Sequence, residues 1–421
     1  MTAALQTAEV IAVGSELLGW TRLDTNSLYI SEKLAALGIQ LTAKAVVGDD
    51  RPRLRELFLS ALDRADVVLL SGGLGPTDDD VTREVVAEAL GLRLVEDASI
   101  TERIRHRFER RGMRMPDVNR RQSMVPDGAS VLANAHGTAP GLLLEGPKIV
   151  VLLPGPPREL RAILDDLCAP GGALAQRAGR DRIHRMSLFT TGRSESHVEE
   201  IAQPIYSKLL RSTPPIETTI LATPGQVELH LSLRSADEAS AITALERARQ
   251  DLVAALGECV FTVDGRPLHV IVDALLRDRG LSFAAAESCT GGLLLQRMTD
   301  IPGSSAVVRG GIVAYSNELK VALLGIDGEL LARHGAVSEA VAAAMADGIR
   351  ERTGADVCVA ITGIAGPDGG TESKPVGTVV IAVRVPGHPL AVHTHLFVGG
   401  RDMVRHQATQ TALDRIRRLL S

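Results

Sequence analysis

Short apolar runs alternate with amphipathic stretches through the first part of the chain, and glycine-rich turns follow the runs. Buried strands that alternate with helices form parallel sheets, so this pattern predicts a doubly wound α/β domain over residues 1–170. In such a sheet, ligands bind beyond the carboxyl ends of the strands. The runs that predict strands are 9–13, 40–47 and 65–73, and helical periodicity occurs at 26–37 and 52–64.

The pattern changes in the region from 171 to 260. Two long polar-apolar periodic stretches predict helices at 194–210 and 237–256. Shorter runs around them predict strands, and a Pro-Gly pair at 224–225 separates two of these strands. We expect a small α+β module that serves as a spacer or as an element of a dimer interface.

A third pattern covers residues 264–421 and again predicts an α/β domain. An apolar run at 281–286 stops at a serine turn, and a further strand is expected to end at Tyr315. The last predicted helix, which residues 399–402 open, has one apolar face. Its members are Met403, Val404, Ala408, Ala412, Leu413, Ile416 and Leu420.

Composition narrows the classes of function. The net charge of −5 gives no basic field for nucleic acid, and 2% aromatic residues leave few platforms for base stacking. No apolar run reaches the roughly 18 residues of a membrane span, and the chain begins without a secretory leader. The cysteines are scattered without a CxxC pair. We therefore expect a cytoplasmic protein with no membrane partner and no nucleic-acid partner.

The third region holds a candidate nucleophile with a candidate base. Ser288 stands at the turn after the 281–286 strand, and Tyr315 and Lys320 follow the next strand. Lysine, unlike arginine, can lose its proton when it is buried, and lysines are few in this arginine-rich chain. Free backbone N–H groups at the helix start after Gly291 and Gly292 could hold an anion. An N-cap is the structural alternative for Ser288.

The first region holds glycine-rich loops beside acidic residues. Gly72, Gly73 and Gly75 precede three consecutive aspartates, and Gly155 lies in a second strand-to-helix loop. Asp49, Asp79 and Asp80 could hold a divalent cation that bridges a pyrophosphate, because hard cations take carboxylate oxygens. A capping box formed by Thr77 and Asp80 is the structural alternative, and the two roles are compatible.

The run from Ser71 to Thr82, with the LPGPP loop at 153–157, resembles the MoaB/MogA molybdopterin-binding family. The resemblance places Asp80 and Asp49 on functional aspartates of that family. Leu74 and Asp79 depart from it, since the family has threonine and arginine at these positions.

Four motifs in the third region closely resemble the CinA C-terminal domain, a PncC-type nicotinamide-nucleotide amidohydrolase. They are AESCTGG, GGIVAYSNELK, ITGIAGPDGG with KPVGTV, and GGRDMVRHQA. The resemblance implies that Ser288 attacks the carboxamide of nicotinamide mononucleotide (NMN), that Lys320 is the general base and that Tyr315 relays or orients the proton. It also implies substrate contacts from Thr362, Gly363 and Arg401, and no cofactor in this domain.

The whole chain resembles full-length CinA proteins. The resemblance implies a KH-type middle module, a homodimer, and a first domain that is a metal-dependent ADP-ribose pyrophosphatase. Two other functions remain open: a nucleotide-binding signal protein without turnover, and a molybdopterin-binding protein.

Overall fold

The computed structural model describes residues 4–421. The chain forms two compact units. Unit 1 comprises residues 1–184 and 234–241, and unit 2 comprises residues 185–233 and 242–421. The boundaries between the units fall inside elements of the middle region, so the three-part division expected from sequence stays a prediction.

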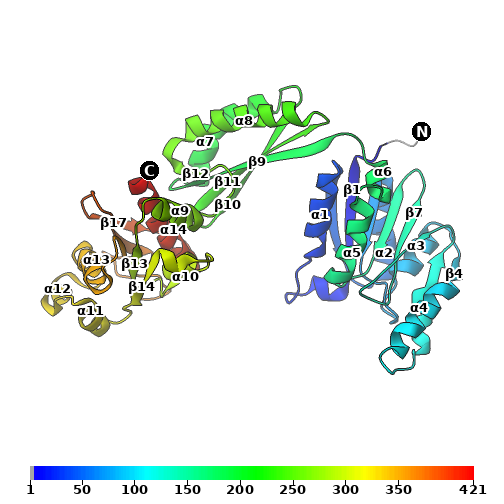
Figure 1. Cartoon of the computed structure of the whole chain (residues 1–421), viewed down its shortest axis with the longest axis horizontal. Helices are drawn as coiled ribbons and strands as arrows, with labels where there is room; N and C mark the ends of the chain where they lie inside the picture. Colours follow the sequence, from blue (N-terminus) through cyan, green and yellow to red (C-terminus); the bar gives the residue numbers. More distant parts are fainter. Residues whose placement is uncertain (1–3) are drawn as a thin grey trace. The chain divides into compact units, whose positions relative to one another are not determined.

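Unit 1 contains a six-stranded sheet with the order β2-β1-β3-β8-β7-β6 (Figure 1). Pairing is parallel from β2 to β8, and β7 and β6 extend the sheet in antiparallel fashion. The predicted parallel sheet is therefore present, with an antiparallel extension. The strands are β1 (Thr7–Val13), β2 (Gln40–Val47), β3 (Val67–Ser71), β6 (Ser130–Leu132), β7 (Gly141–Glu145) and β8 (Ile149–Leu153).

Helices cover both faces of this sheet. Alternate residues of β1, β3 and β8 point to opposite sides, and each side has its own apolar core. One core packs against α1 and α5, and the other packs against α2, α3 and α4. The helices are α1 (Asn26–Ala36), α2 (Arg51–Arg64), α3 (Thr82–Ala89), α4 (Ala98–Glu109), α5 (Pro157–Cys168) and α6 (Ala173–Arg177), with a small sheet of β4 (Leu94–Glu96) and β5 (Met124–Pro126).

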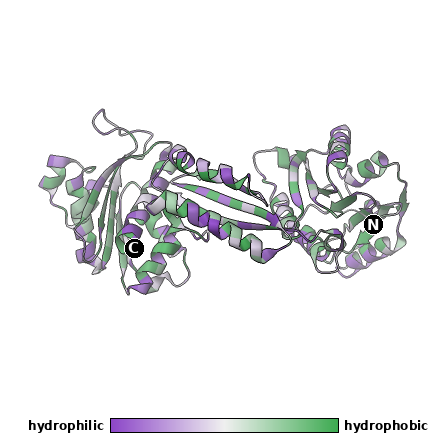
Figure 2. Cartoon of the chain, turned by 90° about the horizontal axis from the view of Figure 1, so that it is seen from above, coloured by the Kyte–Doolittle hydropathy of each residue, from purple (hydrophilic) through white to green (hydrophobic). Residues whose placement is uncertain are grey.

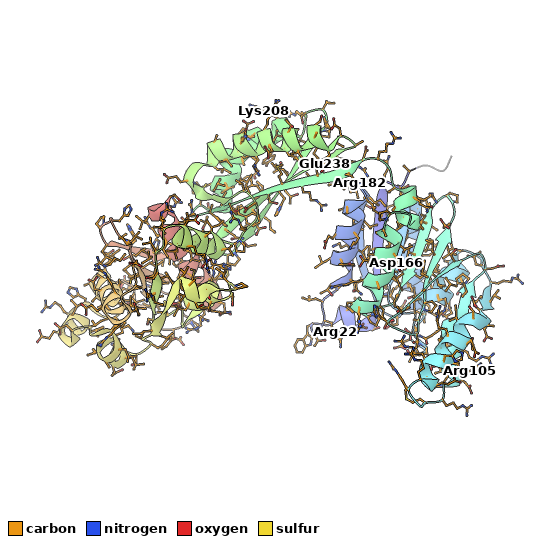
Figure 3. All side chains as sticks on the ribbon, viewed as in Figure 1. Arg22, Arg105, Asp166, Arg182, Lys208 and Glu238 are labelled. Carbon is orange, nitrogen blue, oxygen red and sulfur yellow. The ribbon has the colours of Figure 1, made fainter. Side chains whose placement is uncertain are left out.

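The middle region forms a four-stranded sheet in the order β10-β11-β9-β12 with two helices, as the α+β pattern predicts. Strand β11 alternates buried and half-buried residues, so one of its faces lies against a core. The elements are β9 (Arg182–Thr191), α7 (Glu195–Leu209), β10 (Ile216–Thr223), β11 (Gln226–Ser235), α8 (Glu238–Leu256) and β12 (Val260–Thr262). Lys208 lies on the exposed face of α7 (Figure 3).

The last region contains a five-stranded sheet in the order β14-β13-β15-β16-β17. Strand β13 pairs in parallel with β14 and β15, whereas β16 and β17 are antiparallel to their neighbours. Figure 2 shows hydrophobic residues along these strands. The strands are β13 (Phe283–Glu287), β14 (Val308–Val313), β15 (Val357–Gly363), β16 (Thr378–Arg384) and β17 (Ala391–Leu396).

This sheet also has a core on each face. Helices α9, α10 and α14 pack on one side, and α11, α12 and α13 pack on the other. Because β13 is buried on both faces, its small residues lie between the two helix layers. The helices are α9 (Leu268–Asp278), α10 (Leu293–Thr299), α11 (Asn317–Leu324), α12 (Gly328–His334), α13 (Glu339–Thr353) and α14 (Arg401–Leu420).

Two sequence expectations in this region need correction. Strand β14 ends at Val313, before Tyr315, so Tyr315 lies in the connection to α11. Met403 is 44% exposed, although the other predicted members of the apolar face of α14, including the neighbouring Val404, are buried. Within residues 4–421, no helix is long and apolar enough to cross a membrane.

Candidate active site

Ser288 and Lys320 meet in unit 2. Strand β13 ends at Glu287, and its backbone delivers Ser288 to the carboxyl edge of the sheet. Lys320 lies on α11, and its Nζ is 3.1 Å from the Ser288 Oγ. Both residues are buried, at 7% and 1% exposure. The predicted nucleophile and base are therefore in direct contact.

The surroundings of Lys320 allow a neutral amine. Its Nζ also donates to the backbone oxygens of Ala314, at 3.0 Å, and Tyr315, at 3.3 Å. These three acceptors satisfy the ammonium form; in the neutral form the two N–H groups can stay on the carbonyl oxygens and the lone pair can accept the Ser288 proton. Burial lowers the pKa of Lys320 from its ordinary value of 10.5. The carboxylate of Glu318 opposes this lowering of the pKa, but burial is the larger effect.

The helix start after Ser288 is not the free anion site that the sequence suggested. Glu287 is fully buried, and its carboxylate accepts the backbone N–H groups of Gly292, Leu294 and Leu295 at 3.0, 3.1 and 2.9 Å. Gly291 and Gly292 do not line the cavity beside Ser288. Their role here is the tight turn between β13 and α10, and the start of α10 is occupied by a carboxylate of the protein itself.

Tyr315 lines the cavity beside Ser288, as predicted, and its phenol bonds to an arginine. Tyr315 is 57% exposed, and its hydroxyl accepts a hydrogen bond from Arg401 at 2.7 Å. Arg401 donates in addition to the backbone oxygen of Gly366 at 2.8 Å. The contact of Tyr315 with Lys320 comes from its carbonyl, and the role of the phenol in a proton relay stays a prediction.

A cavity of about 270 Å³ opens beside Ser288, and the predicted residues Thr362, Gly363 and Arg401 line it. The buried Thr362 hydroxyl donates to the backbone oxygen of Ala336 at 2.9 Å. Arg405, which follows Arg401 by one turn of α14, donates to the backbone oxygen of Thr290. The cavity therefore has one guanidinium, that of Arg401, on its wall.

Sequence reasoning missed part of this wall. Asn317, Ala336 and Val337 also line the cavity. Lys374 holds the segment before α13 in place, because its Nζ donates to the backbone oxygens of His334 and Val337. Ala336 and Val337 are apolar residues of a connecting segment and carry no chemical signal, so only the fold could reveal their place on the wall.

A larger cavity, of about 660 Å³, lies at the carboxyl ends of the parallel strands of unit 1. All of the residues predicted there contribute to its lining, namely Asp49, Gly72, Gly73, Gly75, Asp79, Asp80 and Gly155. Asn26, which the pattern indicated only as part of a helix, lines it as well. Its side-chain amide donates to the backbone oxygen of Gly155 at 2.8 Å, so it links α1 to the second glycine loop.

Close backbone packing explains the glycines. Gly72 has φ of 106°, and a Cβ there would stand 2.1 Å from the backbone oxygen of Val13. A Cβ at Gly73 would stand 2.2 Å from the Thr82 hydroxyl. Only glycine allows this loop to fold against β1 and α3, and the loop leaves backbone groups at the cavity edge.

The aspartates of this cavity are partly committed to local hydrogen bonds. Asp49 accepts from the Ser15 hydroxyl at 2.7 Å, and Asp80 accepts from the Thr77 hydroxyl at 2.6 Å. The Thr77–Asp80 contact precedes α3, which begins at Thr82, so it forms a turn and not a helix cap. Within residues 4–421, no three His, Cys, Asp or Glu side chains are gathered to hold a metal ion. The three aspartates therefore do not form a metal site by themselves.

Family models match the chain in two places: the CinA C-terminal domain over residues 266–420 and the probable molybdopterin binding domain over residues 9–171. A CinA-like protein from Acidobacterium capsulatum is 44% identical over 420 residues, which cover 98% of this chain and 99% of the relative. A putative competence-damage inducible protein from Symbiobacterium thermophilum is 45% identical over 424 residues, with 98% of each chain covered.

Among solved structures, that of the competence/damage inducible protein CihA from Agrobacterium tumefaciens is 40% identical. The match covers 37% of this chain and 94% of that chain, with a TM-score of 0.36. The two relatives match this chain over almost their entire length. Residues 9–171 match the family model of the probable molybdopterin binding domain. The chain therefore belongs to the CinA family, with a MoaB/MogA-like domain at its N-terminal end.

Proposed function

We propose that the site in unit 2 is a nicotinamide-nucleotide amidohydrolase, which converts NMN and water to nicotinate mononucleotide and ammonia. The observation that carries the proposal is the buried pair of Ser288 and Lys320, with Nζ 3.1 Å from Oγ. A hydroxyl in contact with a desolvated amine is the arrangement that serine-lysine acyl transfer requires. Membership of the CinA family supports the assignment of the substrate class.

The reaction proceeds in two halves. In the first, the Lys320 amine takes the Ser288 proton while Oγ attacks the carboxamide carbon, and the resulting ammonium returns a proton to the departing ammonia. An ester on Ser288 remains. In the second half, Lys320 takes a proton from water, the hydroxide attacks the ester carbon, and Ser288 leaves as its hydroxyl after it regains the proton.

Two further groups are placed to stabilise the oxyanion and to bind the charged end of the nucleotide. In the described part of the chain, the backbone N–H group of Thr290 donates to no partner, so it is available beside Ser288 for the developing oxyanion. Arg401 uses two of its five N–H donors on Tyr315 and Gly366. Its remaining donors can bind the charged end of a nucleotide.

Ammonia release from NMN tests this proposal. The wild type should release ammonia, and Ser288→Ala should lose about 100- to 10,000-fold of the rate because the nucleophile is gone. Ser305, an exposed serine between α10 and β14 that does not line the cavity, supplies the matched control Ser305→Ala, which should keep the wild-type rate. Equal rates for wild type and Ser288→Ala would refute serine catalysis.

We further propose that the cavity of unit 1 binds ADP-ribose and cleaves its pyrophosphate. Support comes from its volume of about 660 Å³, its glycine loops and its position at the carboxyl ends of the strands. A divalent cation there would need phosphate oxygens of the ligand in addition to carboxylates, as is usual for Mg²⁺. Titration of Mg²⁺ by calorimetry with and without ADP-ribose tests this: binding should strengthen with the nucleotide, and equal affinities would contradict it.

The two rival functions have their own tests. A signal protein without turnover would bind NMN and ADP-ribose but release neither ammonia nor a nucleoside monophosphate. A molybdopterin-binding protein would bind a pterin tightly and fail to respond to ADP-ribose. We propose a homodimer in the cytoplasm as the working state, and sedimentation analysis of the full chain tests the dimer.

A further inference from the structure

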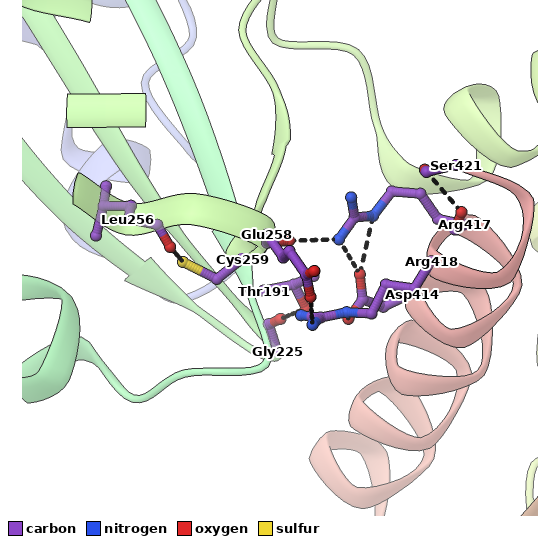
Figure 4. Close-up of polar contacts among 9 residues, drawn as sticks. All are labelled: Thr191, Gly225, Leu256, Glu258, Cys259, Asp414, Arg417, Arg418 and Ser421. Atoms are coloured by element: carbon purple, nitrogen blue, oxygen red, sulfur yellow. Dashed lines mark hydrogen bonds and ion pairs between the residues drawn. The ribbon is translucent and has the colours of Figure 1, made fainter. Parts of the chain in front are cut away.

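A second cavity in unit 2 shares no lining residue with the Ser288 cavity. Its volume is about 590 Å³. The loop between β9 and α7 forms one wall, the turn between β10 and β11 forms another, and side chains of β17 and α14 complete it. A hydrogen bond from the Thr191 hydroxyl to the Gly225 backbone oxygen, at 2.7 Å, ties the first two walls together (Figure 4).

Arginines dominate the charge of this cavity. Arg193, Arg415 and Arg418 line it, together with the carboxylates of Glu195 and Asp414. Asp414 is buried, and both of its oxygens accept from arginines: Oδ1 from Arg417 at 2.7 Å and Oδ2 from Arg418 at 2.7 Å (Figure 4). The negative charge of Asp414 is thereby neutralised inside the wall.

The remaining arginines lack such partners. Within residues 4–421, neither Arg193 nor Arg415 forms an ion pair, so both guanidinium groups keep their donors free. Glu195 is the one lining carboxylate that is not bonded to an arginine of the wall. Two unpaired cations therefore outweigh one carboxylate, and the cavity favours an anion.

The neutral groups of the lining point to the same ligand chemistry. Helix α7 has 15 residues, and its N-terminal end, at Ser194 and Glu195, opens into the cavity, where the helix dipole favours negative charge. His395 also lines it, and the buried Nε2 of this imidazole has no hydrogen-bond partner in the described part of the chain. This nitrogen is enclosed, so the start of α7 is the neutral feature that favours a phosphate.

We infer that this cavity binds the phosphate group of a small metabolite between Arg193, Arg415 and the start of α7. Planar guanidinium forks match the oxygens of a phosphate, which explains arginine at these positions. The site is separate from the Ser288 cavity, so its ligand can bind while the catalytic cavity holds substrate.

Labelling of arginines with phenylglyoxal in the full-length protein, read by peptide mass mapping, tests the inference residue by residue. Inorganic phosphate should protect Arg193 and Arg415, and at ten times its Kd the labelling should fall about tenfold relative to chloride at equal ionic strength. Arg247, an exposed arginine of α8 outside the cavity, serves as the internal control and should label equally in both salts.

Two further arms complete the experiment. AMP that protects at lower concentration than phosphate would identify a nucleotide as the occupant, and equal protection would identify the phosphate group alone as the recognised part. The double variant Arg193→Gln/Arg415→Gln should lose a phosphate-dependent rise in Tm that Arg247→Gln keeps. Equal labelling of Arg193 and Arg415 in phosphate, AMP and chloride would overturn the inference.

Discussion

At the scale of single residues, Lys320 is where the sequence was most informative. Lysine occupies six of the 46 basic positions, and a lysine five residues after Tyr315 stood out in an arginine-rich chain. The contact with Ser288 was predicted correctly. The hydrogen bond of the Tyr315 phenol to Arg401 was not predicted, because Arg401 lies 86 positions away in the sequence.

The pH dependence of ammonia release should follow the loss of the proton from Lys320. Only the neutral amine accepts the Ser288 proton, so kcat/KM should rise with pH and level off above the lowered pKa of Lys320, with a midpoint below 10.5. Lys320→Arg keeps the charge but cannot deprotonate, and it should lose about 100-fold or more. Lys208→Arg, on the exposed face of α7 (Figure 3), is the matched control and should keep the wild-type profile. A rate that is flat or falls with pH would contradict the role of Lys320.

The variant Tyr315→Phe tests whether the phenol relays a proton or only forms part of the cavity wall. The variant removes the hydrogen bond to Arg401 and keeps the carbonyl that holds Lys320. We expect KM for NMN to rise about two- to tenfold with little change in kcat, which corresponds to one hydrogen bond. A fall in kcat of about 100-fold or more would restore the phenol as a relay.

At the scale of elements, the strand, turn and helix around Ser288 followed from the hydrophobic pattern. The pattern could not show that the Glu287 side chain folds back onto the start of α10 and takes three of its N–H groups. It also could not place Ala336 and Val337 on the cavity wall, because Lys374 and Thr362 hold that segment through contacts between distant parts of the sequence.

Glu287→Gln should destabilise unit 2. The substituted amide presents N–H groups where backbone N–H groups of α10 need an acceptor, so at least one buried donor loses its partner. The expected cost is about 1–3 kcal/mol, measured by denaturant unfolding, and activity should fall as the Ser288 turn loosens. Glu329→Gln, at an exposed position of α12, should change stability by no more than about 0.5 kcal/mol. Equal stability of the two variants would show that Glu287 does not hold the turn.

At the scale of the whole molecule, two cavities with different chemistry lie in separate compact units. The sequence predicted both, since each has glycine-rich turns after buried strands. It did not reveal the arginine-lined cavity of unit 2, because that cavity combines residues from β9, β11, β17 and α14. Patterns along the chain describe single elements, and such a site exists only after they pack.

Gly72→Ala should abolish ADP-ribose binding and leave ammonia release from NMN unchanged. The new Cβ would meet the Val13 backbone oxygen at 2.1 Å and displace the glycine loop of unit 1, whereas Ser288 and Lys320 lie in unit 2. Gly91→Ala is the matched control: its φ of 67° is also positive, but a Cβ there meets nothing within 4 Å. It should keep nucleotide binding. Loss of ammonia release in Gly72→Ala alone would show that the two sites depend on each other.

The central claim is that Ser288 and Lys320 act as one unit, and a double-mutant cycle on ammonia release from NMN tests it most directly. If the two residues form a nucleophile and its base, either single variant, Ser288→Ala or Lys320→Arg, removes the whole contribution. We predict that the double variant releases ammonia as slowly as each single variant and no more slowly. A double variant whose loss equals the product of the two single losses, or a single variant that keeps the wild-type rate, would contradict the account.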